Sequence, residues 1–135
     1  MKLVCAKMLV RALPVLALGA FAGAVHADQE VKSSDGMWML HAKVADVLAV
    51  KKSSDATIKA MPEGMAKGCP TVSSVAFEMP SHGHGGSVEP KAAPAGECTW
   101  KITDLNPSMA GDWRLRVVLK NGDKTSNADF SVMAK

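Results

Sequence analysis

The sequence predicts an all-β fold, an antiparallel β-sandwich in which two sheets enclose one hydrophobic core. Apolar and polar residues alternate with a period of two along several short segments, which is the pattern of half-buried strands. Turn residues separate these segments, and an Asn-Gly pair, a strong hairpin signal, stands between two of them. No long amphipathic helix competes with this pattern, although residues 45–52 are compatible with a short local helix.

The clearest strand is expected over residues 112–120. Its apolar residues share one face: Trp113, Leu115, Val117 and Leu119. Asn121-Gly122 follows directly and predicts a hairpin, because both residues tolerate a positive φ angle. The returning strand is then expected over residues 126–133, with Ala128, Phe130 and Val132 facing inward.

Three upstream segments alternate in the same way. Their inward faces are expected to carry Trp38, Leu40, Ala42 and Val44 in the first, Val75, Phe77 and Met79 in the second, and Cys98, Trp100 and Ile102 in the third. A shorter strand is expected over residues 57–61. Five to seven strands therefore make up the predicted sandwich, whereas residues 80–97, rich in glycine and proline, are expected to form one long loop.

Residues 1–27 have the organisation of a secretory signal peptide, with a basic start, an apolar run and small residues at the end. The apolar run has about 14 residues and contains Pro14, whereas a helix that spans a bilayer needs about 20. We therefore expect a cleaved leader rather than a membrane anchor, and a periplasmic or otherwise secreted protein that does not span the membrane.

The expected cleavage site follows Ala27. Val25 and Ala27 occupy the positions three and one before the cut, so that the mature domain would cover residues 28–135. A cut after Ala24 is the alternative.

Net charge excludes one class of function. The leader carries three of the 16 basic residues and none of the 13 acidic ones, so bases and acids balance in the remaining chain. A nucleic-acid-binding domain needs a basic surplus on its folded part. We therefore expect no nucleic-acid partner.

Two cysteines, Cys69 and Cys98, remain beyond the leader. An even pair in an exported protein predicts one disulfide, because the compartment is oxidising. A redox thiol pair and two thiolate metal ligands are the alternatives, and the lack of a C-x-x-C motif disfavours both.

The expected loop carries candidate metal ligands. Imidazole is the commonest protein ligand for metals, and a thioether suits soft ions such as Cu(I). His82 and His84 form a His-x-His pair with a glycine on each side of His84, Met79 stands just before them, and Met109 lies further along the chain. The alternatives are a core position for Met79, which continues an inward face, and a role as polar turn residues for the two histidines.

A second candidate group lies on the first expected strand. Met37, Met39 and His41 are spaced by two, which places them on one face of a strand. Alternatively, the two methionines simply cover apolar surface under a neighbouring element.

The string Met79-Pro80-Ser81-His82-Gly83-His84-Gly85, followed later by Met109-Ala110-Gly111-Asp112-Trp113-Arg114-Leu115, resembles the YtkA-like and FixH-like families. The resemblance covers residues 36–133 and implies an immunoglobulin-like β-sandwich outside the cytoplasmic membrane. FixH-like proteins are associated with copper delivery to terminal oxidases, which implies a copper ligand set of Met79, His82, His84 and Met109. The cysteine pair and the cleavable leader depart from the family pattern and favour a soluble periplasmic protein.

The expected function is therefore non-catalytic binding of copper, with an envelope protein that donates or receives the metal as partner. The alternative is an interaction module that docks another envelope protein without metal. An enzyme is not expected, because the chain has no H-E-x-x-H motif, no persuasive Ser-His-Asp set and no marked carboxylate pair.

Overall fold

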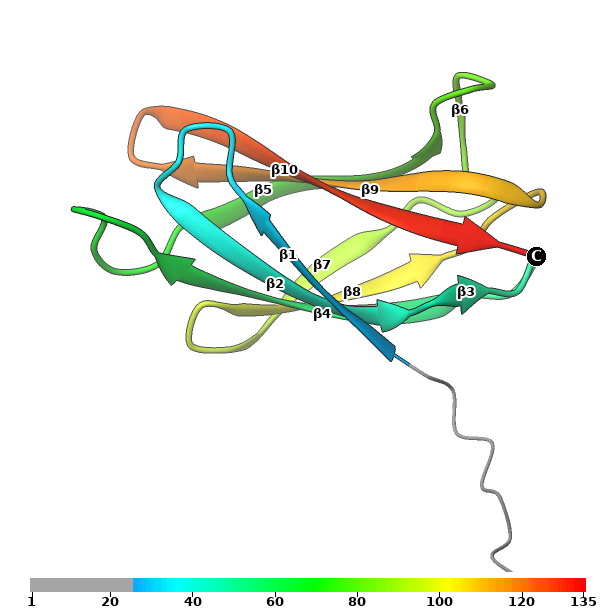
Figure 1. The fold of residues 1–135 in the computed structure, drawn as a ribbon, viewed down its shortest axis with the longest axis horizontal. Helices are drawn as coiled ribbons and strands as arrows, with labels where there is room; N and C mark the ends of the chain where they lie inside the picture. Colours follow the sequence, from blue (N-terminus) through cyan, green and yellow to red (C-terminus); the bar gives the residue numbers. More distant parts are fainter. Residues whose placement is uncertain (1–25) are drawn as a thin grey trace, which may run out of the picture.

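The computed structural model describes residues 26–135, which form two five-stranded sheets packed face to face (Figure 1). No helix occurs in this range, and so none that is long and apolar enough to cross a membrane. The predicted signal peptide lies outside the described residues, except that its last two residues begin the first strand.

The first sheet is antiparallel throughout and has the order β1-β2-β4-β8-β7. Its strands are β1 (His26–Lys32), β2 (Trp38–Ala45), β4 (Ser54–Pro62), β8 (Thr99–Leu105) and β7 (Lys91–Gly96).

The second sheet has the order β3-β10-β9-β5-β6, and all its pairs are antiparallel except β3 with β10. Its strands are β3 (Val47–Leu48), β10 (Lys124–Ala134), β9 (Gly111–Asn121), β5 (Thr71–Met79) and β6 (His84–Gly85).

This strand order confirms the predicted sandwich and has the immunoglobulin topology. Strands β2, β4, β8 and β7 correspond to the A-B-E-D sheet, and β5, β9 and β10 correspond to the C-F-G sheet. The short β6 takes the position of the additional strand after C. β1 is an extra strand on the outer edge of the first sheet, and the chain crosses to the second sheet between β2 and β3 (Figure 1).

The core lies between the sheets and is built from the alternate residues that the sequence pattern placed there. On β9, Trp113, Leu115, Val117 and Leu119 are all buried. The same holds for Trp38, Leu40, Ala42 and Val44 on β2, and for Ala128, Phe130 and Val132 on β10. The period-two alternation was therefore a sufficient guide to the inward faces of the central strands.

Residues 80–97 do not form one continuous loop, as was expected, because β6 and β7 lie within them. All six residues of β7 are exposed, and Pro94 stands inside it. An edge strand of this kind has no buried face, so no alternation reveals it, and proline is tolerated there because one side of the strand needs no hydrogen-bond donor.

Three further expectations were wrong in detail. Residues 45–52 contain the short strand β3 and no helix, β1 was not foreseen, and the described residues form ten strands rather than five to seven.

The hairpin turn is shifted by one residue: Asn121 pairs with Lys124, and Gly122 and Asp123 make the turn. Only Gly122 of these residues has a positive φ, +60°, which fits a turn with glycine at its first central position.

The predicted disulfide is present. Cys69, in the connection between β4 and β5, is bonded to Cys98, just before β8, with their Cα atoms 5.2 Å apart. The bond therefore ties the connection between the two sheets to the start of a central strand of the first sheet.

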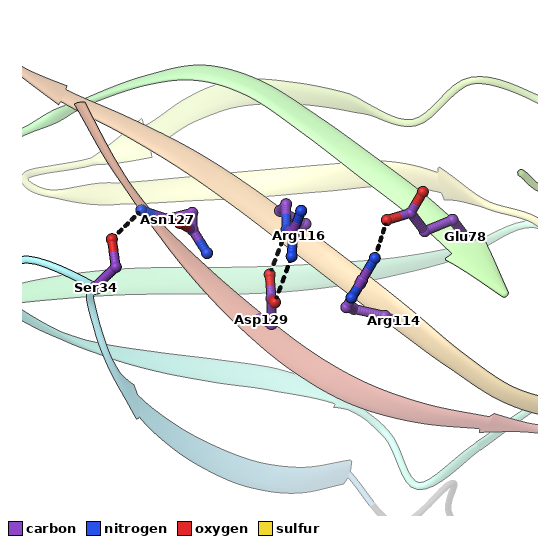
Figure 2. A network of polar contacts seen from close by, with 6 residues as sticks. All are labelled: Ser34, Glu78, Arg114, Arg116, Asn127 and Asp129. Atoms are coloured by element: carbon purple, nitrogen blue, oxygen red, sulfur yellow. Dashed lines mark hydrogen bonds and ion pairs between the residues drawn. The ribbon is translucent and has the colours of Figure 1, made fainter. Parts of the chain in front are cut away.

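Polar pairs cover the outer face of the second sheet (Figure 2). Arg116 of β9 donates two hydrogen bonds to the Asp129 carboxylate of β10, at 2.8 and 2.9 Å, and Arg114 pairs with Glu78 of β5. At the far end, the Asn127 backbone N–H donates to Ser34 Oγ at 3.0 Å, which ties β10 to the β1–β2 turn. These contacts link three adjacent strands and the edge of the other sheet.

Removal of the disulfide should destabilise the fold. The bond closes a loop of 29 residues, and in the chain-entropy account such a loop contributes about 3–4 kcal/mol to the free energy of unfolding. We expect Cys69→Ala/Cys98→Ala to lose that amount in urea denaturation, and the wild type to lose the same amount in reductant. A wild type equally stable with and without reductant would contradict this expectation.

The Arg116–Asp129 pair should make stability depend on pH. Hydrogen bonds from Arg116 hold the pKa of Asp129 below its ordinary value of 3.8. The stabilisation is therefore present above pH 4 and is lost as the pH falls through the lowered pKa. Asp129→Asn should lower the melting temperature at pH 7, and this loss should shrink as the pH falls below 4, while Asp123→Asn in the exposed β9–β10 turn serves as control. A loss that stays the same as the pH falls would assign the effect to packing instead of charge.

Candidate metal centre

The two loop histidines lie on a tight hairpin between β5 and β6. The Met79 carbonyl, at the end of β5, accepts hydrogen bonds from the backbone N–H groups of His82 at 3.1 Å and Gly83 at 2.9 Å. Gly83 has a φ of +65°, which glycine adopts without strain, and His84 then pairs with Met79 across the hairpin. The hairpin stands out from the second sheet at its β6 edge, near one end of the sandwich (Figure 1).

The two imidazoles are exposed and adjacent. Their ring centres are 5.7 Å apart, with 40° between the ring planes. Two imidazoles that share one ion, each with a metal–nitrogen bond of about 2 Å, have ring centres about 5–6 Å apart. The separation of His82 and His84 therefore suits a shared ion.

A hydrogen bond leaves one nitrogen of His84 free for a ligand. Its Nδ1 lies 3.1 Å from the Gly85 carbonyl oxygen, which can only accept. A neutral ring that donates from Nδ1 carries its lone pair on Nε2, the form that binds a metal.

Trp113 joins the hairpin to the loop before β9. Its ring is stacked on Phe77 of β5 with 4.8 Å between ring centres, and His84 lies edge-on to it at 5.9 Å. The indole Nε1–H donates to the Met109 carbonyl oxygen at 3.0 Å. The two segments that carry the family resemblance, although distant in sequence, therefore meet around one indole.

Met79 lies beneath the hairpin, in the core. Its side chain is 1% exposed. A Cβ atom at Gly111 would lie 2.8 Å from the Met79 methyl carbon, so the thioether is packed against the backbone of β9. This burial favours the core interpretation of Met79, one of the two that the sequence left open.

Met109 remains at the surface, 39% exposed, while the hydrogen bond from Trp113 holds its backbone. Of the four candidate residues, His84 and the Met109 backbone contact Trp113, and His82 lies beside His84. Met79 is buried in the core.

The second candidate group is divided. Met37 precedes β2 and packs against the core, whereas Met39 and His41 lie on the outer face of β2, in the opposite sheet to β6. Met39 pairs with Met61 of β4. Sequence reasoning missed Met61 because it had no register between these two strands.

Residues 26–135 contain no group of three or more His, Cys, Asp or Glu side chains that would hold a metal ion. A site on the hairpin would therefore rest on two imidazoles and methionine sulfur. Such a donor set favours soft ions over the harder ions that carboxylates bind.

Comparison with known proteins gives no relative: the chain matches no family model, and neither a curated protein nor a solved structure is significantly similar to it. The resemblance to the YtkA-like and FixH-like families stays a prediction.

Trp113→Ala should remove both core packing and the link between the two loops. Trp113 is 2% exposed, and truncation of a buried tryptophan costs about 3–5 kcal/mol. Trp113→Phe keeps an aromatic ring but loses the hydrogen bond to Met109, so its cost should be smaller, about 1–2 kcal/mol. Urea denaturation of both variants measures these costs, and a near-neutral alanine variant would contradict the position of Trp113 in the core.

Proposed function

We propose that this chain is a non-catalytic protein that binds one copper ion on the β5–β6 hairpin, with His82 and His84 as nitrogen ligands. The supporting observation is the exposed imidazole pair with 5.7 Å between ring centres. The thioether ligand in this proposal is Met109, whose backbone carbonyl accepts a hydrogen bond from the Trp113 indole. His84 packs against the same indole. Met79 is left out of the ligand set because it is buried.

Copper is the preferred metal because of the ligand chemistry. Imidazole and thioether together suit copper, above all Cu(I), whereas zinc sites usually have four ligands of nitrogen and thiolate type. An exposed site with few ligands also exchanges its metal readily. Transfer of copper to or from another protein of the cell envelope is therefore the role that we propose.

Trp113 supports this site by limiting the motion of His84. The indole is held by Phe77 on one side and by the Met109 carbonyl on the other, so the imidazole edge rests on a fixed surface. Ligands that are ordered before the metal binds lose less conformational entropy on binding.

Location outside the cytoplasm is part of the same proposal. The Cys69–Cys98 disulfide is typical of an oxidising compartment. The basic and apolar leader is the sequence feature that would direct export.

Copper titration of the exported protein tests the proposal. Cu(I) and Cu(II) are titrated separately into the wild type and into His82→Ala/His84→Ala. We expect the hairpin equivalent of copper to vanish in the double variant, and Met109→Leu to weaken Cu(I) more than Cu(II), because the thioether prefers the softer ion.

The melting temperature of the metal-free double variant should stay close to that of the wild type, since both histidines are exposed loop residues. Binding that is equal in the wild type and the double variant would refute the copper proposal.

The alternative proposal is a metal-independent interaction module, and one feature favours it. β6 pairs only with Glu78 and Met79, so residues 71–76 of β5 have no strand partner on that side among residues 26–135. An extended segment of another envelope protein would add there as a further strand. Docking that survives both chelation of copper and the His82→Ala/His84→Ala change would favour this alternative.

A further inference from the structure

A hollow of about 370 Å³ lies on the outer face of the first sheet. Three adjacent strands, β2, β4 and β8, supply its lining, which consists of His41, Lys43, Thr57, Lys59, Met61 and Thr99. Strand register explains why these residues meet. Lys59 pairs with His41 on one side and with Thr99 on the other, and Lys43 pairs with Thr57. Because side chains two residues apart on a strand share a face, the whole lining stands on the solvent side of the sheet.

Two cations of this lining have no anionic partner within residues 26–135. Lys101, on the same face, forms an ion pair with Asp55 at 3.3 Å. Lys43 and Lys59 form no such pair, although Asp28 of β1 is the register partner of Lys43. No carboxylate lines the hollow either. The hollow therefore presents two ammonium groups whose charge is not offset nearby.

The surface below these ammonium groups is mainly apolar. Lysine side chains present their methylene stems beneath the charged ends, and the Met61 side chain beside them is 43% exposed. The imidazole of His41 adds no free nitrogen, because its Nδ1 lies 3.1 Å from Glu30 Oε1 and its Nε2 is buried. A ligand in the hollow would therefore meet carbon and sulfur atoms below and positive charge above.

We propose that this hollow binds a small organic carboxylate with an apolar body, such as a short aliphatic or aromatic acid. The ammonium groups of Lys43 and Lys59 hold the carboxylate oxygens, and the exposed Thr57 hydroxyl donates a further hydrogen bond. Met61 and the lysine stems cover the apolar body. A few polar groups that orient a ligand over an apolar lining are the usual composition of a small-molecule site.

Charge and apolar contact are both needed for this selectivity. A neutral ligand of the same shape leaves the two ammonium groups unpaired, and an anion without an apolar body leaves the lining in water. The site lies on the opposite sheet from the His82/His84 hairpin, so it does not depend on the copper proposal.

Methyl NMR of the unmutated protein, titrated with benzoate, tests the site. We expect the methyl signals of Met61 and Thr57 to shift until they saturate, and that of Met65, which is 93% exposed elsewhere, to stay in place. Benzamide, which has the same ring without the charge, should bind about tenfold more weakly, as expected for the loss of two exposed ion pairs. Acetate, which keeps the charge without the ring, should bind severalfold more weakly, and added salt should weaken benzoate.

Variants of exposed residues identify the groups that hold the ligand. Lys43→Gln and Lys59→Gln should each weaken benzoate about two- to fivefold. Lys124→Gln, the same change of charge at the start of β10 in the other sheet, is the matched control. Met61→Ala should weaken benzoate severalfold, whereas Met65→Ala should not. None of these side chains is buried, so the melting temperature should stay close to that of the wild type.

Four results would each overturn the carboxylate site. They are the absence of a saturable shift at Met61, equal affinity for benzamide and benzoate, equal affinity for acetate and benzoate, and equal weakening by Lys124→Gln and Lys59→Gln. The copper proposal is decided separately, by the titration of the His82→Ala/His84→Ala protein.

Discussion

The packing of Trp113 between β5 and the loop before β9 is the interaction on which the candidate site depends. The indole belongs to the core through its stack on Phe77, yet the imidazole of His84 lies edge-on to it, and its N–H donates to the Met109 carbonyl. A buried ring can impose its rigidity on a surface hairpin because its own rotamer is determined by close packing. The position of the hairpin therefore depends on packing against a core residue as well as on contacts within the hairpin.

The same end of the molecule relies on glycine where backbones approach closely. At Gly111 the Met79 methyl group occupies the space of a side chain, and at Gly86 a Cβ atom would lie 2.5 Å from the Asn106 carbonyl oxygen. The first contact packs Met79 of β5 against the start of β9, and the second packs the segment after β6 against the connection between β8 and β9. A side chain at either position would push the hairpin away from Trp113.

The hairpin presents its candidate ligands to solvent. The imidazoles of His82 and His84 are exposed and an aromatic surface supports one of them, which suits an ion that is passed on. Within residues 26–135 no group of three or more His, Cys, Asp or Glu side chains is placed to hold a metal ion. The donors of the proposed site would be imidazole and thioether, which suit copper better than calcium or magnesium.

The sequence by itself determined the sandwich, the inward faces of β2, β5, β8, β9 and β10, and the disulfide. Each of these follows from a local signal, because alternation with period two reports burial directly and an even cysteine pair needs no geometry to be recognised. Tertiary structure alone decided the edges: β7 has no buried face, and β1 and β3 exist only because a neighbouring strand supplies their hydrogen bonds. It also decided between the two interpretations of Met79, which is buried, and it placed Met39 opposite Met61 through the pairing of β2 with β4. Strand register joins residues that are distant in the chain, and the alternation within one strand does not show which residue of another strand will lie opposite.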